Sequence, residues 1–382
     1  MLVAFSCIAL NLLATLLFHV SAFVPDNTNI ARIRPLAGPG IEGKATLKCD
    51  PRRRRRPRPR CQCQLSAAVA KGVSSEEIRI RNLEQLNKLR TRDRQSRKIS
   101  KDELNIVFED EYIVCVDKPS GVLCVPSEED IPTLAQTVFE TVSNQQSSLD
   151  KMVVHRLGME TSGLVLFAKT MESLRGMNTL FRTRKITRKY EVLVCGHVAD
   201  DQGTIDMPLM RDYMRPPFMR ISTDLHQRVL LDLDDAIVGK KLLEAPKSSQ
   251  TCYDVIGREF FLDNTDLPVT RLLLTSITGR THQLNVHMAA IGHPIVGDRV
   301  YGLDGDALPN GGLDIVSEEE NENDNENKNE NGDSASAASI ELQRAIGAKA
   351  TNMCVHAKCL SFHHPMLSPD DDPLSFESAA PF

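Results

Sequence analysis

A group of four polar side chains stands directly before an apolar run in the first half of the chain. Residues 155–170 read HRLGMETSGLVLFAKT, and residues 164–168 have the composition of a buried strand. A buried strand needs no such polar group at its start, so we interpret the group as candidate site residues: His155, Arg156, Thr161 and Ser162. His155 is either a base for proton transfer or a hydrogen-bonded scaffold residue at the strand end.

A second segment of the same kind, residues 278–302, reads TGRTHQLNVHMAAIGHPIVGDRVYG. Arg280 is a candidate to hold either a phosphate or the loop itself. We expect His282 and Gln283 to hydrogen bond this loop to the wall of the pocket. The pairs at positions 297–298 and 301–302 have turn composition. The two segments together predict one polar pocket.

A run of basic residues precedes Tyr190 and indicates contact with a polyanion. It consists of Arg182, Arg184, Lys185, Arg188 and Lys189, to which Arg211, Arg215 and Arg220 add further positive charge. We interpret these residues as a cationic stripe beside the pocket that suits an RNA backbone. The alternative is that the run is a solvated helix end.

Hydrophobic periodicity predicts the elements that position these residues. A helix is expected over residues 74–100, with Ile78, Ile80, Leu83, Leu86 and Leu89 on its apolar face. A hairpin is expected from residues 104–108 and 112–116, a helix over 134–142, and further strands at 153–154, 164–168, 190–194, 272–277 and 359–362. Residues 281–291 predict a helix with Leu284, Met288 and Ile291 on one face. These elements favour an α+β fold, with a mixed, mainly antiparallel sheet and surrounding helices.

The two polar segments together resemble the RluA-like pseudouridine synthase family. Residues 107–127, VFEDEYIVCVDKPSGVLCVPS, resemble the opening strands of that family, and the resemblance covers roughly residues 104–382. It implies a pseudouridine synthase-like catalytic domain of mixed fold. It also implies isomerisation of uridine to pseudouridine in tRNA or rRNA without a cofactor, on a base flipped out of its stack.

The resemblance assigns roles to individual positions and exposes two departures. The arginine of the family falls on Arg156, and its stacking tyrosine falls on Tyr190. The catalytic aspartate of the H-R-L-D loop falls on Gly158, and the arginine that pairs with it falls on Asn285. Because a buried charge without its partner is costly, the loss of both removes a penalty of roughly a few kcal/mol that the loss of one would leave.

The missing pair leaves two hypotheses open. In the first, the protein is a synthase with a modified site, in which Glu160 substitutes as base or nucleophile. An extended loop would put Glu160 on the same side as position 158, whereas a turn would direct it elsewhere. In the second, the protein is a non-catalytic RNA-binding relative that acts as an RNA chaperone or adaptor.

The N-terminal composition predicts a targeting segment. Residues 1–22 combine an apolar run with a small-residue cleavage pattern, which predicts a signal peptide. Residues 23–75 resemble a transit peptide, and over residues 1–75 twelve Lys and Arg stand against three acidic residues. Because Phe23 follows the cleavage pattern directly, we expect delivery to a plastid through a bipartite presequence. One alternative is delivery to a mitochondrion. The other is the secretory pathway, in which the protein would be secreted and its arginine tract would bind polyanions.

The remaining segments and partners follow from composition. Residues 76–103 are expected to be a leading helix and linker, and residues 104–382 the synthase-like domain. The acidic segment 317–333, SEEENENDNENKNENGD, predicts a disordered insertion. No paired CxxC spacing occurs among the ten cysteines, and Cys359, His363 and His364 lack a matching pair, so we expect no metal. We expect no cofactor either, because the reaction that the resemblance implies is an isomerisation.

Charge limits how RNA can bind. The formal net charge is −5 and the presequence is strongly basic, so the remainder of the chain is acidic overall. Binding to RNA must therefore depend on the local stripe and on shape. We expect RNA as the partner, no membrane contact of the mature protein, and a monomer.

Overall fold

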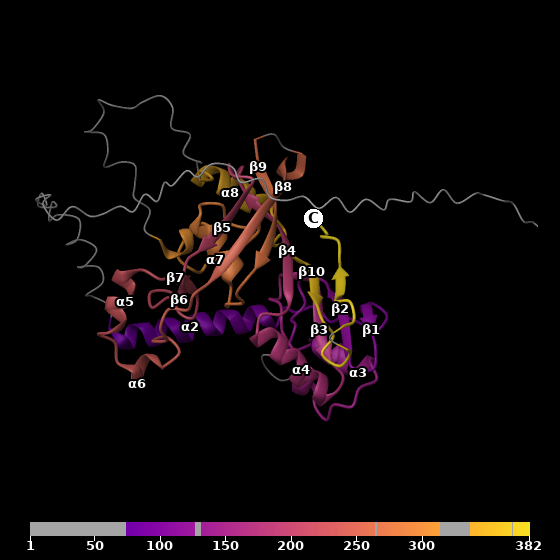
Figure 1. The fold of residues 1–382 in the computed structure, drawn as a ribbon. Coiled ribbons are helices and arrows are strands. Elements are labelled where there is room, and N and C mark those ends of the chain that lie inside the picture. The colour runs from indigo at the N-terminus through magenta and orange to yellow at the C-terminus, as the bar shows by residue number, and fades with distance from the viewer. Residues whose placement is uncertain (1–73, 127–130, 264–265, 314–336, 369) are drawn as a thin grey trace, which may run out of the picture. The chain divides into compact units, whose positions relative to one another are not determined.

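The computed structural model describes residues 74–126, 131–263, 266–313, 337–368 and 370–382 (Figure 1). The predicted signal peptide, nearly all of the transit segment and the acidic insertion at 317–333 lie outside these residues. The helical lead-in, the sheet and both polar segments lie within them.

A mixed sheet organises the described residues, as the sequence predicted. Nine strands run in the order β1-β2-β3-β10-β4-β9-β8-β5, with β11 beside β10, and among the described pairings only β3 and β10 are parallel. The strands are β1 (Asn105–Glu109), β2 (Ile113–Lys118), β3 (Ser162–Ala168), β4 (Thr187–Cys195), β5 (Gln202–Asp206), β8 (Gln250–Phe260), β9 (Pro268–Ser276), β10 (Val355–Phe362) and β11 (Leu374–Glu377). A separate pair consists of β6 (Leu209–Arg211) and β7 (Met219–Ile221).

Helices lie around this sheet, and side-chain caps fix several of their starts. In the described residues they are α2 (Ser75–Asp93), α3 (Leu134–Thr141), α4 (Met171–Arg182), α5 (Asp224–Leu230), α6 (Asp235–Val238), α7 (Gln283–Ala290) and α8 (Ile340–Lys349), with 3-10 turns at Leu149–Lys151, Phe261–Asp263 and Asn310–Gly312. Ser74 and Glu77 form a capping box at the start of α2, and Thr170 and Ser173 form one at the start of α4. Each cap satisfies backbone N–H groups that the first helical turn leaves without partners.

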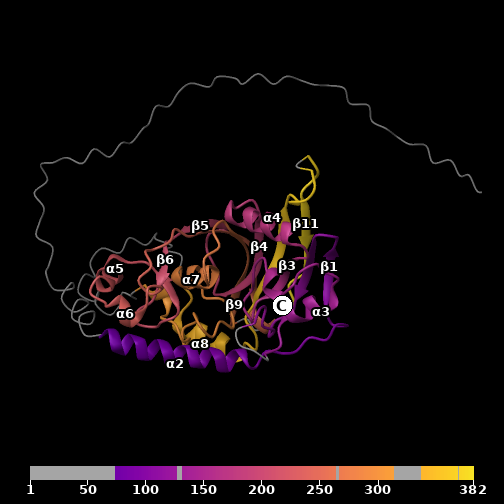
Figure 2. The same cartoon turned by 90° about the horizontal axis from the view of Figure 1, so that it is seen from below.

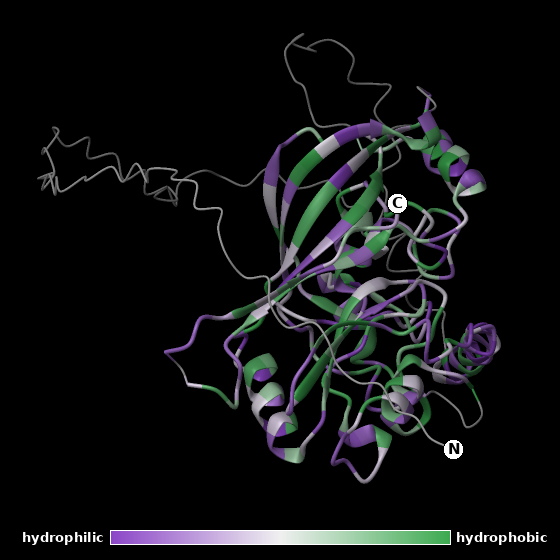
Figure 3. Ribbon diagram, turned by 90° about the vertical axis from the view of Figure 1, so that its right-hand side faces the viewer, coloured by the Kyte–Doolittle hydropathy of each residue, from purple (hydrophilic) through white to green (hydrophobic). Residues whose placement is uncertain are grey.

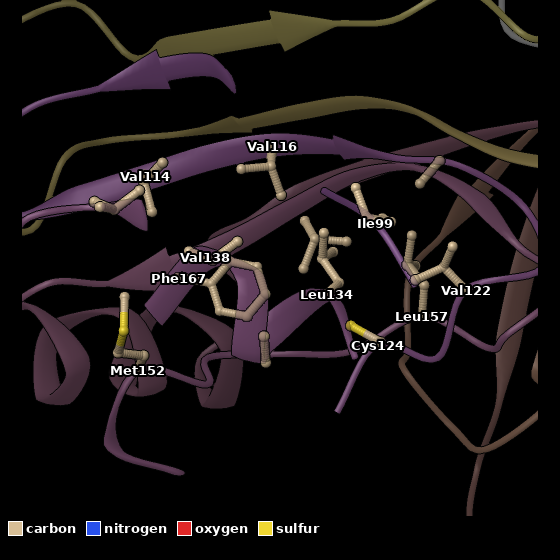
Figure 4. Close-up of a cluster of buried hydrophobic side chains, with 14 residues drawn as sticks. Ile99, Val114, Val116, Val122, Cys124, Leu134, Val138, Met152, Leu157 and Phe167 are labelled. Carbon is tan, nitrogen blue, oxygen red and sulfur yellow. The ribbon is translucent and has the colours of Figure 1, made fainter. Parts of the chain in front are cut away.

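Two buried clusters meet near the middle of the sheet. The first packs β2 and β3 against α3 and contains Val116, Phe167 and Leu157 (Figure 4). The second packs β4 and β9 against α7 through Leu284 and Met288, the face that the helical spacing predicted. Hydrophilic and hydrophobic residues alternate along the long strands (Figure 3), and burial follows the same alternation along much of β9. Tyr190 of β4 packs against both clusters and therefore lies at their junction.

Two sequence predictions need correction. Ile78 of α2 is buried and Leu89 packs against a core cluster, but Ile80 and Leu83 are 45% and 47% exposed. The helix lies against α6 (Figure 2), and the side that carries Ile78 packs there in a core cluster, whereas Ile80 and Leu83 face solvent. The expected strand at 153–154 is a single bridge between Val153 and Phe167. The hairpin, the helix α3 and the strands β3, β4, β9 and β10 lie where the sequence predicted them, within a few residues.

Candidate functional site

Buried groups of β2 and the turn after it hold the backbone of the loop before β3. Lys118 is fully buried, and its Nζ donates to the carbonyl oxygen of Met159 at 2.8 Å and to that of Pro119 at 2.9 Å. The Ser120 hydroxyl donates to the carbonyl oxygen of Glu160 at 2.7 Å. Burial lowers the pKa of Lys118 to about 8, although the charges of Cys124 and Glu160 act in the opposite direction.

Gly158 leaves room for a side chain on this loop. The residue is exposed and its φ is outside the left-handed region, so the backbone does not require glycine. An added Cβ would meet only the Thr161 Oγ1 within 4 Å, at 3.4 Å. The backbone at position 158 could therefore carry a carboxylate side chain, and neither backbone conformation nor lack of space accounts for its absence.

The residues after Gly158 form a turn. The Thr161 N–H donates to the Gly158 carbonyl oxygen at 3.2 Å, so the loop is not extended here. The negative charge of Glu160 acts on Lys118, below the loop. Of the two conformations considered from the sequence, the structure has the turn, so Glu160 does not take the side that an extended loop would give it.

His155 and Ser162 both direct their polar atoms into the scaffold. The His155 Nε2 accepts from the Leu166 N–H at 3.0 Å, and burial together with the charge of Arg188 lowers the pKa of His155 to about 3. The Ser162 hydroxyl is buried 2.9 Å from the His356 Nδ1. This is the geometry of residues that position the loop and remain neutral.

Ser162 begins a hydrogen-bonded chain that ties the loop to the C-terminal segment. The His356 Nε2 lies 3.1 Å from the Ser378 hydroxyl, which donates to the Asp117 Oδ2 at 2.5 Å. Burial lowers the pKa of His356, so its imidazole is neutral. No pattern of residues predicts this series of hydrogen bonds, because its members lie in β2, β3, β10 and the segment after β11.

Tyr190 and Arg188 lie between the two polar segments. Tyr190 is half-buried, and burial raises the pKa of its hydroxyl, which therefore stays neutral. The Arg188 guanidinium lies 5.8 Å from the centroid of the Phe181 ring and donates to the Ser276 carbonyl oxygen at 3.4 Å. A Cβ on Gly279 would come within 2.8 Å of Arg188 Nη1, so a glycine allows the arginine to approach the second loop.

The second loop is connected through its own side chains. The buried Gln283 Oε1 accepts from the Thr278 hydroxyl at 2.6 Å and from the Arg280 N–H at 3.1 Å. The Gln283 Nε2 donates to the Gln250 carbonyl oxygen and to the Thr251 hydroxyl, each at 2.9 Å. Every polar atom of the Gln283 amide therefore has a partner.

His282 presents one ring nitrogen outward. Its φ of 52° is left-handed, an uncommon conformation for a residue with a side chain. The residue as a whole is exposed, but its Nδ1 lies 2.7 Å from the Tyr301 hydroxyl. Desolvation of the ring and the charges of Arg211 and Arg156 lower the pKa of His282 to about 4. The Tyr301 oxygen already accepts from the Met219 N–H at 3.1 Å, so we assign its proton to the bond with Nδ1 and the imidazole proton to Nε2.

Asn285 has a carboxylate partner that sequence reasoning missed. Its Nδ2 donates to the Asp298 Oδ2 at 2.7 Å. The Asp298 Oδ1 accepts from the N–H groups of Val300 and Tyr301, as the turn composition of this pair predicted. Burial raises the pKa of Asp298, while these hydrogen bonds act in the opposite direction. The turn composition around Asp298 does not predict that its second carboxylate oxygen accepts a hydrogen bond from Asn285 of α7.

The basic residues divide into exposed and structural ones. Arg182, Arg184, Lys185 and Arg215 are exposed, and Arg188, Lys189 and Arg211 are half-buried. Arg220, by contrast, is 7% exposed and donates to the carbonyl oxygens of Ile221 and Gly312. The prediction that Arg220 belongs to the cationic stripe is therefore wrong, because its guanidinium is used inside the fold.

Two further searches concern other classes of site. Within the described part of the chain, no three His, Cys, Asp or Glu side chains lie together as metal ligands. Cys359 and His363 belong to or follow β10, and His364 is buried with its Nε2 3.2 Å from the Asp110 Oδ2. No helix among the described residues is both long and apolar enough to cross a membrane.

Comparison with known proteins identifies relatives of the segment that contains both loops. A family model described as RNA pseudouridylate synthase matches residues 112–290. The dual-specificity RNA pseudouridine synthase RluA of Vibrio vulnificus is 37% identical over 202 residues, which cover 53% of this chain and 70% of the relative. The protein of the same name from Escherichia coli is 36% identical over 198 residues, covering 52% of this chain and 77% of the relative. The solved human RNA pseudouridylate synthase domain containing 1 aligns at 22% identity with a TM-score of 0.48, covering 75% of this chain and 87% of that one.

Proposed function

Because the chain belongs to the RNA pseudouridylate synthase family, we propose that it binds a flipped-out uridine of tRNA or rRNA between the loop that carries Gly158 and the loop that begins at Thr278. The observation that carries this proposal is the position of Tyr190 at the junction of the two core clusters. A half-buried aromatic ring there can stack on a base, while the exposed Arg156 of the first loop can contact backbone phosphate or replace the flipped base in its stack.

His282 adds a hydrogen-bond donor to this site. Since its pKa is about 4, the imidazole is neutral at pH 7, and its Nε2–H points away from Tyr301. A neutral donor suits an uracil carbonyl oxygen or a phosphate oxygen without adding a charge that varies near pH 7. The hydrogen bond between its Nδ1 and the Tyr301 hydroxyl holds the ring in this orientation.

Isomerisation makes a further demand on the site. The bond between N1 of uracil and C1′ of the ribose must break, the ring must turn, and a bond from C5 to C1′ must form. The proton on C5 is then removed and N1 takes up a proton, so that the product is an isomer of uridine. A carboxylate near the sugar and base is the group that the family uses, and Gly158 supplies none. Glu160 is the candidate substitute, and the turn at residues 158–161 would have to change for it to take the side of position 158 that an extended loop would give it.

A second candidate function is RNA binding without chemistry, as a chaperone or adaptor. The specific observation in its favour is that Asn285 is paired with Asp298 and that the loop after Gly158 is turned, so Glu160 does not take the side that an extended loop would give it. Neither position supplies the missing pair in this conformation.

One experiment separates the two candidates. The purified protein is incubated with total organellar RNA and with structured tRNA, and pseudouridine positions are mapped before and after. New pseudouridine that disappears in Glu160→Gln and persists in the matched control Glu172→Gln supports the enzyme. Tight binding without new pseudouridine supports the RNA-binding relative, and the absence of both binding and modification contradicts the proposal. Light scattering on the same sample tests the expected monomer.

We further propose that the protein works in a plastid. The apolar run of residues 1–22, the aromatic Phe23 and the basic composition up to residue 75 support this location. A fluorescent reporter with residues 1–22 should enter the secretory pathway, and one with residues 1–75 should reach the plastid. A reporter with residues 1–75 that stays in the cytosol or is secreted would contradict the plastid location.

A further inference from the structure

A small cavity lies beside the second loop and outside the uridine site described above. Its volume is about 210 Å³, and its walls come from β6, β7, the segment 244–247 and the segment 279–281. β7 packs on α7, and the segment 279–281 stands before the first turn of α7 (Figure 1). The cavity therefore lies where the β6–β7 pair meets the start of α7.

The charged side chains of the cavity are fixed to its walls. The Arg280 Nε donates to the Ser248 carbonyl oxygen at 3.0 Å, and the Arg211 Nη1 donates to the Pro217 carbonyl oxygen. Lys247 forms an ion pair with Glu244 at 2.5 Å. Among the lining residues three cations stand against one carboxylate, so the cavity has an excess of positive charge. The ion pair occupies Lys247, and this leaves Arg211 and Arg280 as the groups suited to an added anion.

One wall of the cavity is apolar. Met210 and Met219 line it from β6 and β7, and Met210 is buried beneath the surface. Thioether side chains are polarisable and adapt to flat or irregular ligands. The lining therefore pairs a phosphate-binding side with a side that suits a base or a ribose.

The cavity adjoins the uridine site. Its segment 279–281 leads directly into His282, whose ring is also influenced by the charges of Arg211 and Arg156. Arg156 belongs to the first loop and Arg211 to the cavity, so His282 lies within electrostatic range of both. The N-terminus of α7 adds its partial positive charge at the same place.

Size restricts the ligand. Sites for drug-sized molecules occupy about 300–1,000 Å³. A volume of about 210 Å³ is smaller and suits a single nucleotide unit of a longer strand. A nucleotide next to the flipped uridine has a charge and an apolar portion that match this cavity, whose lining ends at Thr281, directly before His282.

We propose that this cavity binds the nucleotide adjacent to the target uridine in the RNA strand, with its phosphate between Arg211 and Arg280 and its base or ribose against Met210 and Met219. The inference rests on the proposed function, because the same RNA must occupy the uridine site. It assigns to the β6–β7 pair and to residues 244–247 a role in choosing the sequence or shape around the target.

Variants expected to weaken and to tighten RNA binding test the proposal. The full chain is titrated with a fluorescein-labelled oligouridylate of eight nucleotides at several salt concentrations. Arg280→Gln should weaken binding about tenfold, because a charge-assisted contact is lost. It should also lower the slope of log Kd against log salt by about 0.7, the value for one phosphate of a single strand. Glu244→Gln removes the competing carboxylate at an exposed position and should tighten binding.

Controls distinguish the cavity from general charge effects and from misfolding. Arg344→Gln removes an exposed arginine of α8 that lines no part of the cavity, and it should bind as the parent does. Ala245→Glu adds a negative charge at an exposed lining position and should weaken binding even if Arg280→Gln folds poorly. A 4-thiouridine version of the oligonucleotide should cross-link to the peptides that contain Met210 or Met219.

Two negative outcomes have different meanings. If the parent binds the oligouridylate but Arg280→Gln, Glu244→Gln and Ala245→Glu all keep its affinity and salt slope, the cavity holds no RNA and the proposed function stands. If the folded parent binds neither the oligouridylate nor structured RNA, the proposed function fails, and the cavity proposal fails with it.

Discussion

The two loops at the candidate site achieve order in different ways. The loop before β3 is held by groups outside it. Lys118, Ser120 and the Gly121 N–H donate hydrogen bonds to its backbone carbonyl oxygens, and His155 accepts a hydrogen bond from the Leu166 N–H. The loop that begins at Thr278 is held by its own side chains, through the amide of Gln283. In the first loop, therefore, the exposed side chains are not needed to hold the loop in place. In the second loop the polar side chains themselves hold the loop in place.

This difference explains where the chemistry of the site has changed. The contact that position 158 gives the turn comes from its backbone carbonyl oxygen, so a glycine without a side chain keeps that contact. Position 285 lies on a buried helix, and its side chain has a partner in Asp298. A departure from the family pattern is tolerated at the first position because the turn uses only its backbone, and at the second because an alternative partner exists.

The largest effect is expected from restoring the missing pair. Gly158→Asp fits the space at that position, but once RNA covers the loop the new carboxyl would lack a counter-charge and its pKa would rise. Asn285→Arg supplies the counter-charge, and Asp298 can help to hold the guanidinium. The double variant should form at least about tenfold more pseudouridine than the two single variants together, because coupled neighbours are not additive.

The measurement is conversion of uridine in one RNA set by the parent, both single variants and the double variant. A double variant no better than the sum of the singles would show that the pocket is no longer shaped for uridine. Efficient turnover by the unmodified parent that Glu160→Gln abolishes would show instead that Glu160 has taken over the catalytic role.

The second effect is on stability and concerns the loop that its own side chains hold. Gln283→Ala removes the partners of Thr278, Arg280 N–H and two groups of β8, all of them near the core. The free energy of unfolding should fall by about 3 kcal/mol, measured by urea denaturation. The exposed Gln227→Ala is the matched control and should change it by less than about 0.5 kcal/mol. Equal effects of the two changes would contradict the assigned difference between the loops.

A third effect concerns RNA affinity at the junction of the two loops. Tyr190→Ala should weaken binding of a structured RNA by about 1–3 kcal/mol through the loss of base stacking. Tyr190→Phe keeps the ring and should bind as the parent does, and Arg156→Ala should weaken binding through the loss of a backbone contact. Binding is measured by fluorescence anisotropy on variants with parent-like circular dichroism. Parent-like affinity of both alanine variants would remove Tyr190 and Arg156 from the RNA site.

The smallest effect is a pH dependence that reports on the first loop. The pKa of His155 falls from 6.5 to about 3 on folding because of burial, so the folded state favours the neutral ring. This contribution to stability is present above pH 6.5 and is lost as the pH falls from 6.5 toward 3. His155→Gln can still accept from the Leu166 N–H but cannot titrate, so its melting temperature should fall less steeply between pH 7 and pH 5 than that of the parent. Parallel pH profiles would show that His155 already titrates in the folded state.

The amino-acid sequence by itself determined the mixed sheet, the family and the positions of both loops. Periodicity of apolar residues depends on local geometry, which is why β3, β4, β9, β10 and α7 were predictable within a few residues. The motifs around His155 and Thr278 could also be recognised from the sequence, because each loop is one continuous segment. The loss of the carboxylate at position 158 was visible from a single letter.

Only the tertiary structure decided which polar atoms meet. The pairing of Asn285 with Asp298, the chain from Ser162 through His356 to Asp117, and the burial of Arg220 each join segments that lie far apart or on separate elements. The turn at residues 158–161 likewise fixed the direction of Glu160, which two backbone conformations had left open. The physical reason is that a side chain's hydrogen-bond partner depends on long-range packing and on backbone dihedral angles, neither of which residue spacing specifies.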